Sequence, residues 1–398
     1  MEDKWVHANV DLNSIGLNYK KIIRIVNSGD LQMDFYNYAR FFYEAAETII
    51  EYLLVEASKN HDIAKLDLWY FAMIYLYRQS LELLIKASIF QNVTDTTKRK
   101  EVIGDIRHDL KQAFELLIKE KGLQVNGNKN AEWVSDYLSD ISQIDRESDM
   151  FRYPFGRNFK ALFQDQTDIS LVATQNNMGN AYSVVENIYK DSSFPTHIYT
   201  AFPPKLIIQG GSYYQRSVVG YKYAQNSFYP YFSSYSEVGS FLRDKVVMEN
   251  KDDLFLPMCY LYRNAVELGL KRIIFEDSHV SEAKAMKIMS TKKHSILGLW
   301  NSIKVEIEKT ANAPQKDPTL GDVQQYIKMF HDFDQSSDRF RYPCNKNMDS
   351  YFLDARRFDV ENVANCFEEL LTFLDSVDSM FSATRDYEIE MMSEYSCD

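Results

Sequence analysis

The sequence predicts an all-α protein made of two tandem, homologous helical bundles packed as a pseudo-dimer. Apolar residues recur at i, i+3, i+4 and i+7 in nearly every long segment, as at Phe367, Leu370, Leu371 and Leu374. Strand-like alternation is almost absent. Two blocks of sequence each occur twice, which indicates an internal duplication. Repeated helical patterns of this kind are typical of bundles.

The duplication is carried by two pairs of segments. Residues 75–90 (YLYRQSLELLIKASIF) align without gaps to 260–275 (YLYRNAVELGLKRIIF), and nine of sixteen positions are identical. Residues 145–158 (DRESDMFRYPFGRN) align to 334–347 (DQSSDRFRYPCNKN), and eight of fourteen are identical. The order and spacing of these pairs therefore predict two homologous units.

The first helical unit is expected at 30–190 and the second at 222–385. Between them the linker 193–221 gathers proline and glycine, which favour turns, and its LIIQ and SVVGY pieces predict a short irregular segment or a hairpin. The acidic tail, 386–398, is expected to fray. A chain of 398 residues agrees with two domains of roughly 100–200 residues each.

Helical periodicity predicts four or five helices in each unit. The expected helices lie at 34–56, 66–91, 106–121, 129–146 and 168–190, and again at 229–248, 252–276, 292–309, 320–333 and 359–383. The first helix of each unit carries an aromatic run at helical spacing, FYNYARFFY or FYPYFSSYS, which we interpret as core rather than as a platform for bases. The second helix is apolar almost throughout, so we expect it to be central.

A charged stripe crosses this apolar helix in both units. Its residues stand at i, i+4 and i+8 on one face, and they are Arg78, Glu82 and Lys86 in the first unit and Arg263, Glu267 and Lys271 in the second. Buried charges need partners. The Phe-Arg-Tyr-Pro blocks offer them, through Asp145, Asp149 and Arg152 and through Asp334, Asp338 and Arg341. The proline of each block ends any helix and holds the preceding tyrosine extended.

One histidine follows the stripe in each unit, 30 residues after Arg78 and 31 after Arg263. With N-caps at Asp105 and Thr291, His108 and His294 would lie in the first turn of a helix, where the dipole disfavours a proton. A neutral imidazole suits a general base and equally a capping side chain. For the stripe, a buried ion-pair network, a phosphate pocket and a solvated face all remain open.

Charge and missing motifs exclude several function classes. A formal net charge of −12 disfavours general coating of nucleic acids but allows a local cationic pocket. Phosphate loops, dinucleotide fingerprints, zinc-binding cysteine pairs, His-Glu-x-x-His and Gly-x-Ser-x-Gly are all absent from the sequence. We therefore expect no cofactor and no metal. The start lacks a signal-like pattern and no apolar run approaches ~20 residues, so we expect a cytoplasmic protein without a membrane span.

The order Tyr-Arg-x-x-x-Glu-Leu-x-x-Lys, then His, then Phe-Arg-Tyr-Pro resembles the HEPN-like superfamily (higher eukaryotes and prokaryotes nucleotide-binding), including its abortive-infection relatives. The resemblance implies all-α units that pair as dimers. It also implies either a metal-independent ribonuclease of phage-defence or toxin–antitoxin systems, or a non-catalytic binding module. The nuclease signature of that superfamily is an Arg followed after four to six residues by His on one helix, and none of the helices expected here contains this spacing.

The resemblance implies a site where the two units face each other. In place of the missing signature, we expect Arg78 and Arg152 to hold the scissile phosphate and His108 to deprotonate the ribose 2′-OH. Arg263, Arg341 and His294 form the second set. The expected substrate-binding residues are Lys86, Lys271, Tyr77, Tyr262, Tyr153 and Tyr342. The expected supporting ion pairs involve Glu82, Glu267, Asp145, Asp149, Asp334 and Asp338.

Three hypotheses follow. The first is an endoribonuclease that leaves 2′,3′-cyclic phosphate ends without a metal. The second is a non-catalytic module whose pocket binds a nucleotide, an RNA end or a partner protein such as an antitoxin or a defence-system subunit. The third is a purely structural or regulatory helical protein, and further homo-oligomers are compatible with each.

Overall fold

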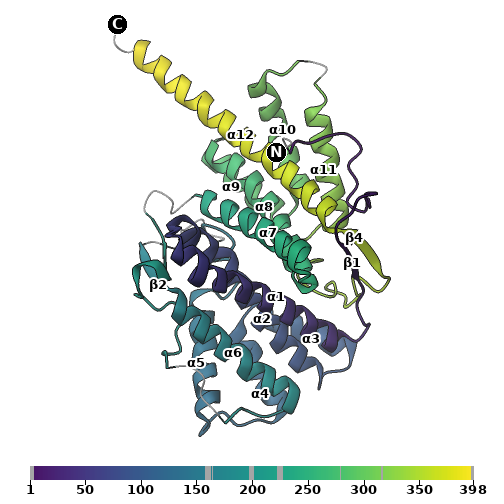
Figure 1. Ribbon diagram of the computed structural model, residues 1–398, viewed down its shortest axis with the longest axis vertical. Coiled ribbons are helices and arrows are strands. Elements are labelled where there is room, and N and C mark those ends of the chain that lie inside the picture. The colour runs from purple at the N-terminus through teal and green to yellow at the C-terminus, as the bar shows by residue number, and fades with distance from the viewer. Residues whose placement is uncertain are drawn as a thin grey trace.

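The computed structural model describes residues 4–156, 163, 165–196, 201–221, 227–277, 279–314 and 317–395. Within these residues it is mostly helical, with twelve α-helices and four short strands (Figure 1), which confirms the all-α prediction at that level. We call residues 4–196 the first half and 201–395 the second half. Among the described residues, no helix combines the length and apolarity that crossing a membrane requires.

The first half contains β1 (Ile22–Ile25), α1 (Leu31–Tyr52), α2 (Ile63–Phe90), α3 (Thr96–Ile106), α4 (Leu110–Lys121), α5 (Lys129–Ile144), β2 (Thr167–Ser170) and α6 (Leu171–Asp191). The second half contains β3 (Arg216–Val219), α7 (Tyr229–Glu249), α8 (Phe255–Arg272), α9 (Glu282–Lys292), α10 (Ile296–Ala311), α11 (Thr319–Phe333), β4 (Arg356–Asp359) and α12 (Val360–Tyr395). The elements thus follow one another in the same order in both halves.

Helices α2 and α8 form the centre, as their apolar sequences predict. Every residue from Tyr70 to Phe90 of α2 is buried, and so is every residue from Phe255 to Lys271 of α8. Helix α2 packs against α1, α4, α6 and α7, whereas α8 packs against α7, α10 and α12. Figure 1 shows α1, α2, α7 and α8 in the middle of the molecule, with the remaining helices of the two halves on opposite sides.

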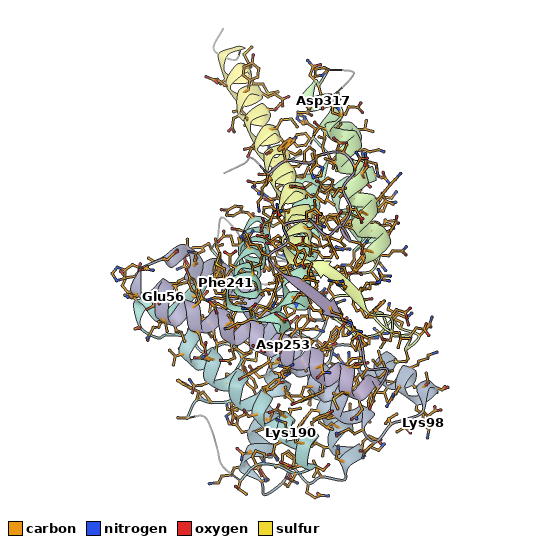
Figure 2. All side chains as sticks on the ribbon, turned by 45° about the vertical axis from the view of Figure 1, so that its right-hand side comes forward. Glu56, Lys98, Lys190, Phe241, Asp253 and Asp317 are labelled. Atoms are coloured by element: carbon orange, nitrogen blue, oxygen red, sulfur yellow. The ribbon has the colours of Figure 1, made fainter. Side chains whose placement is uncertain are left out.

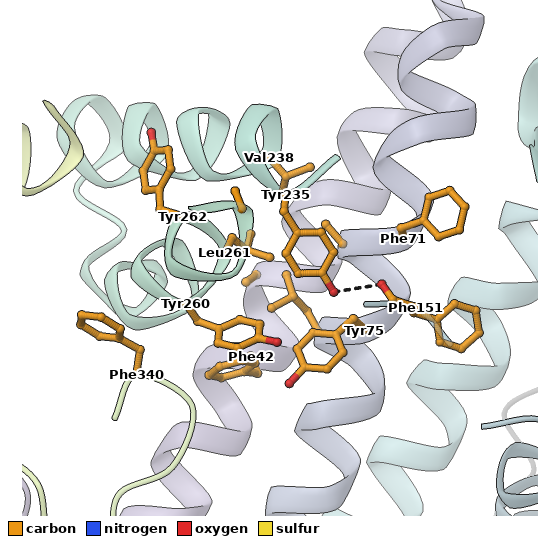
Figure 3. Packing of buried hydrophobic residues seen from close by; sticks show 14 of the residues in the cluster. Phe42, Phe71, Tyr75, Phe151, Tyr235, Val238, Tyr260, Leu261, Tyr262 and Phe340 are labelled. Carbon is orange, nitrogen blue, oxygen red and sulfur yellow. Dashed lines mark hydrogen bonds between the residues drawn. The ribbon is translucent and has the colours of Figure 1, made fainter. Parts of the chain in front are cut away.

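Aromatic rings join the two halves into one core (Figure 3). Tyr75 of α2 stacks on Tyr260 of α8, with ring centroids 5.0 Å apart and planes inclined by 21°. Phe42 of α1 also contacts Tyr260, at 6.0 Å between centroids. Tyr235 of α7 donates a hydrogen bond of 3.0 Å to the carbonyl of Phe151. Most rings of the aromatic runs therefore belong to the core, as we interpreted them, although Tyr229 is exposed.

The four strands pair between elements far apart in sequence. Strand β1 is antiparallel to β4, with Ile22 opposite Asp359, and β2 is antiparallel to β3, with Thr167 opposite Val219. The hairpin expected within 193–221 is wrong, because its two pieces pair with β2 and not with each other: β3 forms one ladder, and Gln209 bridges Ile169.

Three further expectations about helices are wrong. Helices α3 and α9 were not expected, because their sequences are polar and bury only Ile106 in α3 and Ala285 and Met289 in α9. Helix α12 continues to Tyr395, so the described part of the acidic tail is helical and not frayed. Its C-terminal end projects from the rest of the molecule (Figures 1 and 2).

Candidate functional site

A large cleft is lined by residues of both halves, and its cavity volume is about 1080 Å³. Both sequence-predicted histidines, His108 and His294, line it. Its nine cationic residues outnumber its three acidic residues, Glu147, Asp149 and Asp338. The cations are Lys86, Lys100, Arg107, Arg152, Lys271, Lys292, Lys293, Arg341 and Lys346. In a protein with a net charge of −12, this local excess of positive charge favours anionic ligands.

The first centre in the cleft is built around the buried carboxylate of Glu82. It accepts hydrogen bonds from Lys86 Nζ at 2.6 Å, from Arg78 Nη1 at 3.1 Å and from the Tyr342 hydroxyl at 2.7 Å. His108 Nδ1 lies 3.1 Å from the same carboxylate. Four donors on three elements therefore converge on one buried anion, which is the arrangement that a buried charge requires.

The second centre repeats these contacts around Glu267. Its carboxylate accepts from Lys271 Nζ at 2.7 Å, from the Tyr153 hydroxyl at 2.8 Å and, more weakly, from Arg263 Nη1 at 3.4 Å. His294 Nδ1 lies 2.9 Å from it. The residues that align in the sequence thus make corresponding contacts in the structure.

Each centre takes its tyrosine from the other half. Tyr342 belongs to the second half but binds Glu82, and Tyr153 belongs to the first half but binds Glu267. Lys271 also lies over the ring of Tyr153, 4.2 Å from its centroid. The expected grouping within each unit, with Arg152 beside His108, is therefore replaced by one in which each Phe-Arg-Tyr-Pro block serves the opposite histidine.

Arg78 and Arg263 are not available to hold a phosphate, contrary to expectation. Both are buried, and neither lines the cleft. Arg78 donates to the His108 carbonyl at 2.6 Å and forms an ion pair with Asp145 at 3.1 Å, in addition to its contact with Glu82. Arg263 donates to the His294 carbonyl at 2.8 Å. Both arginines therefore position the histidine turns.

The remaining carboxylates of the expected set hold the Phe-Arg-Tyr-Pro turns. Asp145 accepts from the Asp149 backbone N–H at 2.8 Å, and Asp334 accepts from the Asp338 N–H at 3.0 Å. Two of the expected substrate-binding tyrosines lie elsewhere. Tyr77 donates to Glu47 and Tyr262 to Glu368, and neither tyrosine lines the cleft.

Arg152 and Arg341 line the cleft and are held in fixed orientations. Arg152 donates from Nε to the Ser148 carbonyl at 2.6 Å and from Nη2 to Asp149 at 2.9 Å. Arg341 has the same arrangement, with Asp338 at 2.7 Å. The buried Nη1 of Arg341 has no hydrogen-bond partner within the described part of the chain. Both guanidinium groups are thus fixed at the cleft with their charge partly balanced by an aspartate.

The two histidines precede their helices, so the predicted caps at Asp105 and Thr291 are wrong. Asp109 caps α4 and Ser295 caps α10, and each histidine is the residue before the cap. Both histidine side chains remain partly exposed, by 30% and 38%. Among the described residues, neither Nε2 contacts a hydrogen-bond partner. The orientation of these rings therefore comes from Glu82 and Glu267 and not from a helix dipole.

The electrostatics favour a neutral His108 with its proton on Nδ1. Burial raises the pKa of the Glu82 carboxyl, but Lys86, His108 and Arg78 lower it more, to well below its usual range. Glu267 has the same balance, with Lys271, His294 and Arg263 lowering its pKa. For His108, Glu82 raises the pKa, yet burial, Lys86 and Arg341 outweigh it, and the pKa is lowered. An ionised carboxylate only accepts, so Nδ1 carries the proton and Nε2 keeps its lone pair.

Sequence reasoning missed five of the cations at the cleft: Lys100, Arg107, Lys292, Lys293 and Lys346. Arg107 and Lys293 directly precede the two histidines. Because the histidines align between the two halves, a basic residue at the same preceding position was visible in the sequence. The others lie on α3, on α9 and after the second Phe-Arg-Tyr-Pro block.

No group of three or more His, Cys, Asp or Glu side chains among the described residues is arranged to hold a metal ion. Comparison with protein-family models, with curated proteins and with solved structures gives no match for this chain. The residues of the cleft are therefore the basis for any inference about its chemistry.

We expect the free energy of unfolding to fall in acid because of the buried Glu82 and Glu267. Their folded-state pKa values lie below the unfolded value near 4.5, so their stabilisation is complete above about pH 5 and is lost as the pH falls through the folded-state values. His108, whose pKa is also lowered, adds a loss of the same sign below about pH 6.5. Urea unfolding between pH 7 and pH 3 measures this slope.

A matched control is Glu115→Gln, which removes an exposed carboxyl of α4 that reaches Lys111 only at 4.0 Å. Its curve is expected to run parallel to that of the wild type. A free energy of unfolding that stays constant from pH 7 to pH 3 would contradict the assignment.

Proposed function

We propose that this chain is a HEPN-like, metal-independent endoribonuclease that cuts RNA bound in the cleft and acts in bacterial defence or in a toxin–antitoxin pair. The observation that carries the proposal is the pair of carboxylate-oriented histidines that line one cationic cleft and whose Nε2 atoms have no hydrogen-bond partner among the described residues. The superfamily assignment rests on the three repeated sequence blocks. On this proposal the two halves are duplicated units forming a pseudo-dimer around the cleft.

The proposed reaction needs only groups present in the chain. The Nε2 of His108 or His294 takes the proton of a ribose 2′-OH, and the buried glutamate stabilises the imidazolium that forms. The 2′-oxygen attacks the adjacent phosphorus, and the bond from phosphorus to the 5′-oxygen breaks. The leaving 5′-oxygen takes its proton from the imidazolium, which returns to the neutral histidine. The cations of the cleft stabilise the negative charge on the phosphorane. The products are a 2′,3′-cyclic phosphate and a 5′-hydroxyl.

Binding without cleavage is the second candidate. One observation favours it: Arg152 and Arg341 are each already paired with an aspartate, which reduces the charge left to stabilise a transition state. On this alternative the same cleft holds a nucleotide, an RNA end or an acidic segment of a partner protein.

Cleavage of total RNA in EDTA tests the proposal. We expect the wild type to produce cyclic-phosphate ends and His108→Ala/His294→Ala to cut roughly 10²–10⁴-fold more slowly, since that is the usual contribution of a general base. His7→Ala, which alters an exposed histidine outside the cleft, is the control and should cut at the wild-type rate. RNA that is bound but left intact at high enzyme concentration would favour the second candidate.

A further inference from the structure

Two cations of the cleft have an unusual backbone conformation. Arg107 has φ 44° and ψ −104°, and Lys293 has φ 50° and ψ −104°. Both residues end a helix, α3 or α9, and both directly precede a histidine of the cleft. Side chains rarely adopt this region, because the Cβ atom crowds the backbone there.

The conformation belongs to a tight turn that glycine would form without strain. The Asp109 N–H donates to the Ile106 carbonyl at 2.8 Å, and the Ser295 N–H donates to the Lys292 carbonyl at 2.9 Å. Arg107 and Lys293 are the second residues of these turns, with dihedral angles close to those of type II′, where glycine is the usual residue. In both turns a long cationic side chain therefore occupies a position that is better suited to glycine.

The turn accounts for the orientation of the histidine, but it does not require a cationic side chain at the preceding position. It directs the His108 carbonyl to Arg78 and the His108 ring to Glu82, and those contacts use only the backbone of Arg107. The side chains of Arg107 and Lys293 are exposed, line the cleft and have no ion-pair partner among the described residues. Strained residues of this kind concentrate at binding and catalytic sites.

We infer that Arg107 and Lys293 bind phosphate groups of the RNA strand, each placing a phosphate beside the histidine that follows it. This inference rests on the proposed function, and it assigns to these two residues the role first expected for Arg78 and Arg263. Arginine binds phosphate as a bidentate donor and lysine as a point charge. Both can therefore recognise phosphate without contacting the base.

The test replaces both residues by glycine. Glycine removes the cationic side chain but adopts the turn without strain, so that effects on binding and on backbone strain can be distinguished. Arg107→Gly/Lys293→Gly keeps the turn and relieves its strain, so the melting temperature should stay equal or rise. Affinity for a 2′-O-methyl oligouridine, which cannot be cut, should fall at least tenfold. The slope of log K against log salt should shrink by about 1.4, because two phosphate contacts are lost from a single strand.

Two further variants complete the test. Lys119→Ala/Lys309→Ala removes two exposed lysines from the last turns of α4 and α10, outside the cleft, and should bind the oligouridine like the wild type. Arg107→Lys/Lys293→Arg should retain both affinity and salt slope. Unchanged affinity and slope in the glycine variant, in a wild type that cuts RNA, would overturn this inference alone. A wild type that neither binds the oligouridine nor cuts RNA would overturn the proposed function as well.

Discussion

Replacing Glu82 by glutamine is expected to lower the free energy of unfolding by about 3–5 kcal/mol, the range found when one partner of a buried ion pair is removed. The glutamate is 1% exposed and is the common acceptor for Arg78, Lys86 and His108. A neutral amide removes the carboxylate that balances the buried Lys86, and it leaves Arg78 with only its ion pair to Asp145. The amide N–H group would also face side chains that are themselves hydrogen-bond donors.

Urea unfolding at pH 7 measures the effect. Glu115→Gln is the matched control, because Glu115 lies on the exposed face of α4 and reaches Lys111 only at 4.0 Å. That control should change the free energy by less than about 0.5 kcal/mol. A loss below about 1 kcal/mol for Glu82→Gln would show that the cluster is hydrated and not buried.

Replacing Tyr260 by alanine is expected to destabilise the protein by about 3–5 kcal/mol, as large aromatic truncations in a core do. The ring is fully buried and contacts Phe42 and Tyr75 of the first half and Tyr235 of the second. The cavity would therefore open where the halves meet. Because both halves line it, we expect one unfolding transition at a lower temperature and not the separate melting of one half.

Calorimetry and circular dichroism of the Tyr260→Ala variant test this expectation together. Tyr387→Ala is the control, since Tyr387 lies on the projecting end of α12 with 61% of its surface exposed. Its effect should stay within about 0.5 kcal/mol. Two well-separated transitions in the Tyr260→Ala variant would contradict a shared core.

The long helices were predictable because burial on one side leaves a period of 3.6 in the sequence. Helices α3 and α9 leave almost no such period, since nearly all of their residues face solvent. Strands β1, β2 and β4 were missed for a different reason, whereas the SVVGY piece had indicated β3. Each has four residues, and the partners of β1 and β4 are separated by more than three hundred residues, so no local pattern records their pairing.

The candidate site was predictable in its residue types and less so in its grouping. The stripe Arg78–Glu82–Lys86 follows from helical spacing alone, and the structure brings the three side chains together. The sequence does not predict which tyrosine binds Glu82. The Phe-Arg-Tyr-Pro block occurs twice, and both copies have the same local sequence pattern. Only the packing of the halves decides that Tyr342 and not Tyr153 binds Glu82.

The pairing of β1 with β4 has a consequence for synthesis on the ribosome. Residues 22–25 emerge early, but their partner, 356–359, follows about 330 residues later. At the usual 5–20 residues per second this interval is roughly 15–65 s. During that time the backbone donors and acceptors of the early strand lack their final partner, and an open strand edge invites pairing with other chains. The edge of the early strand therefore stays open to such pairing until residues 356–359 have been translated.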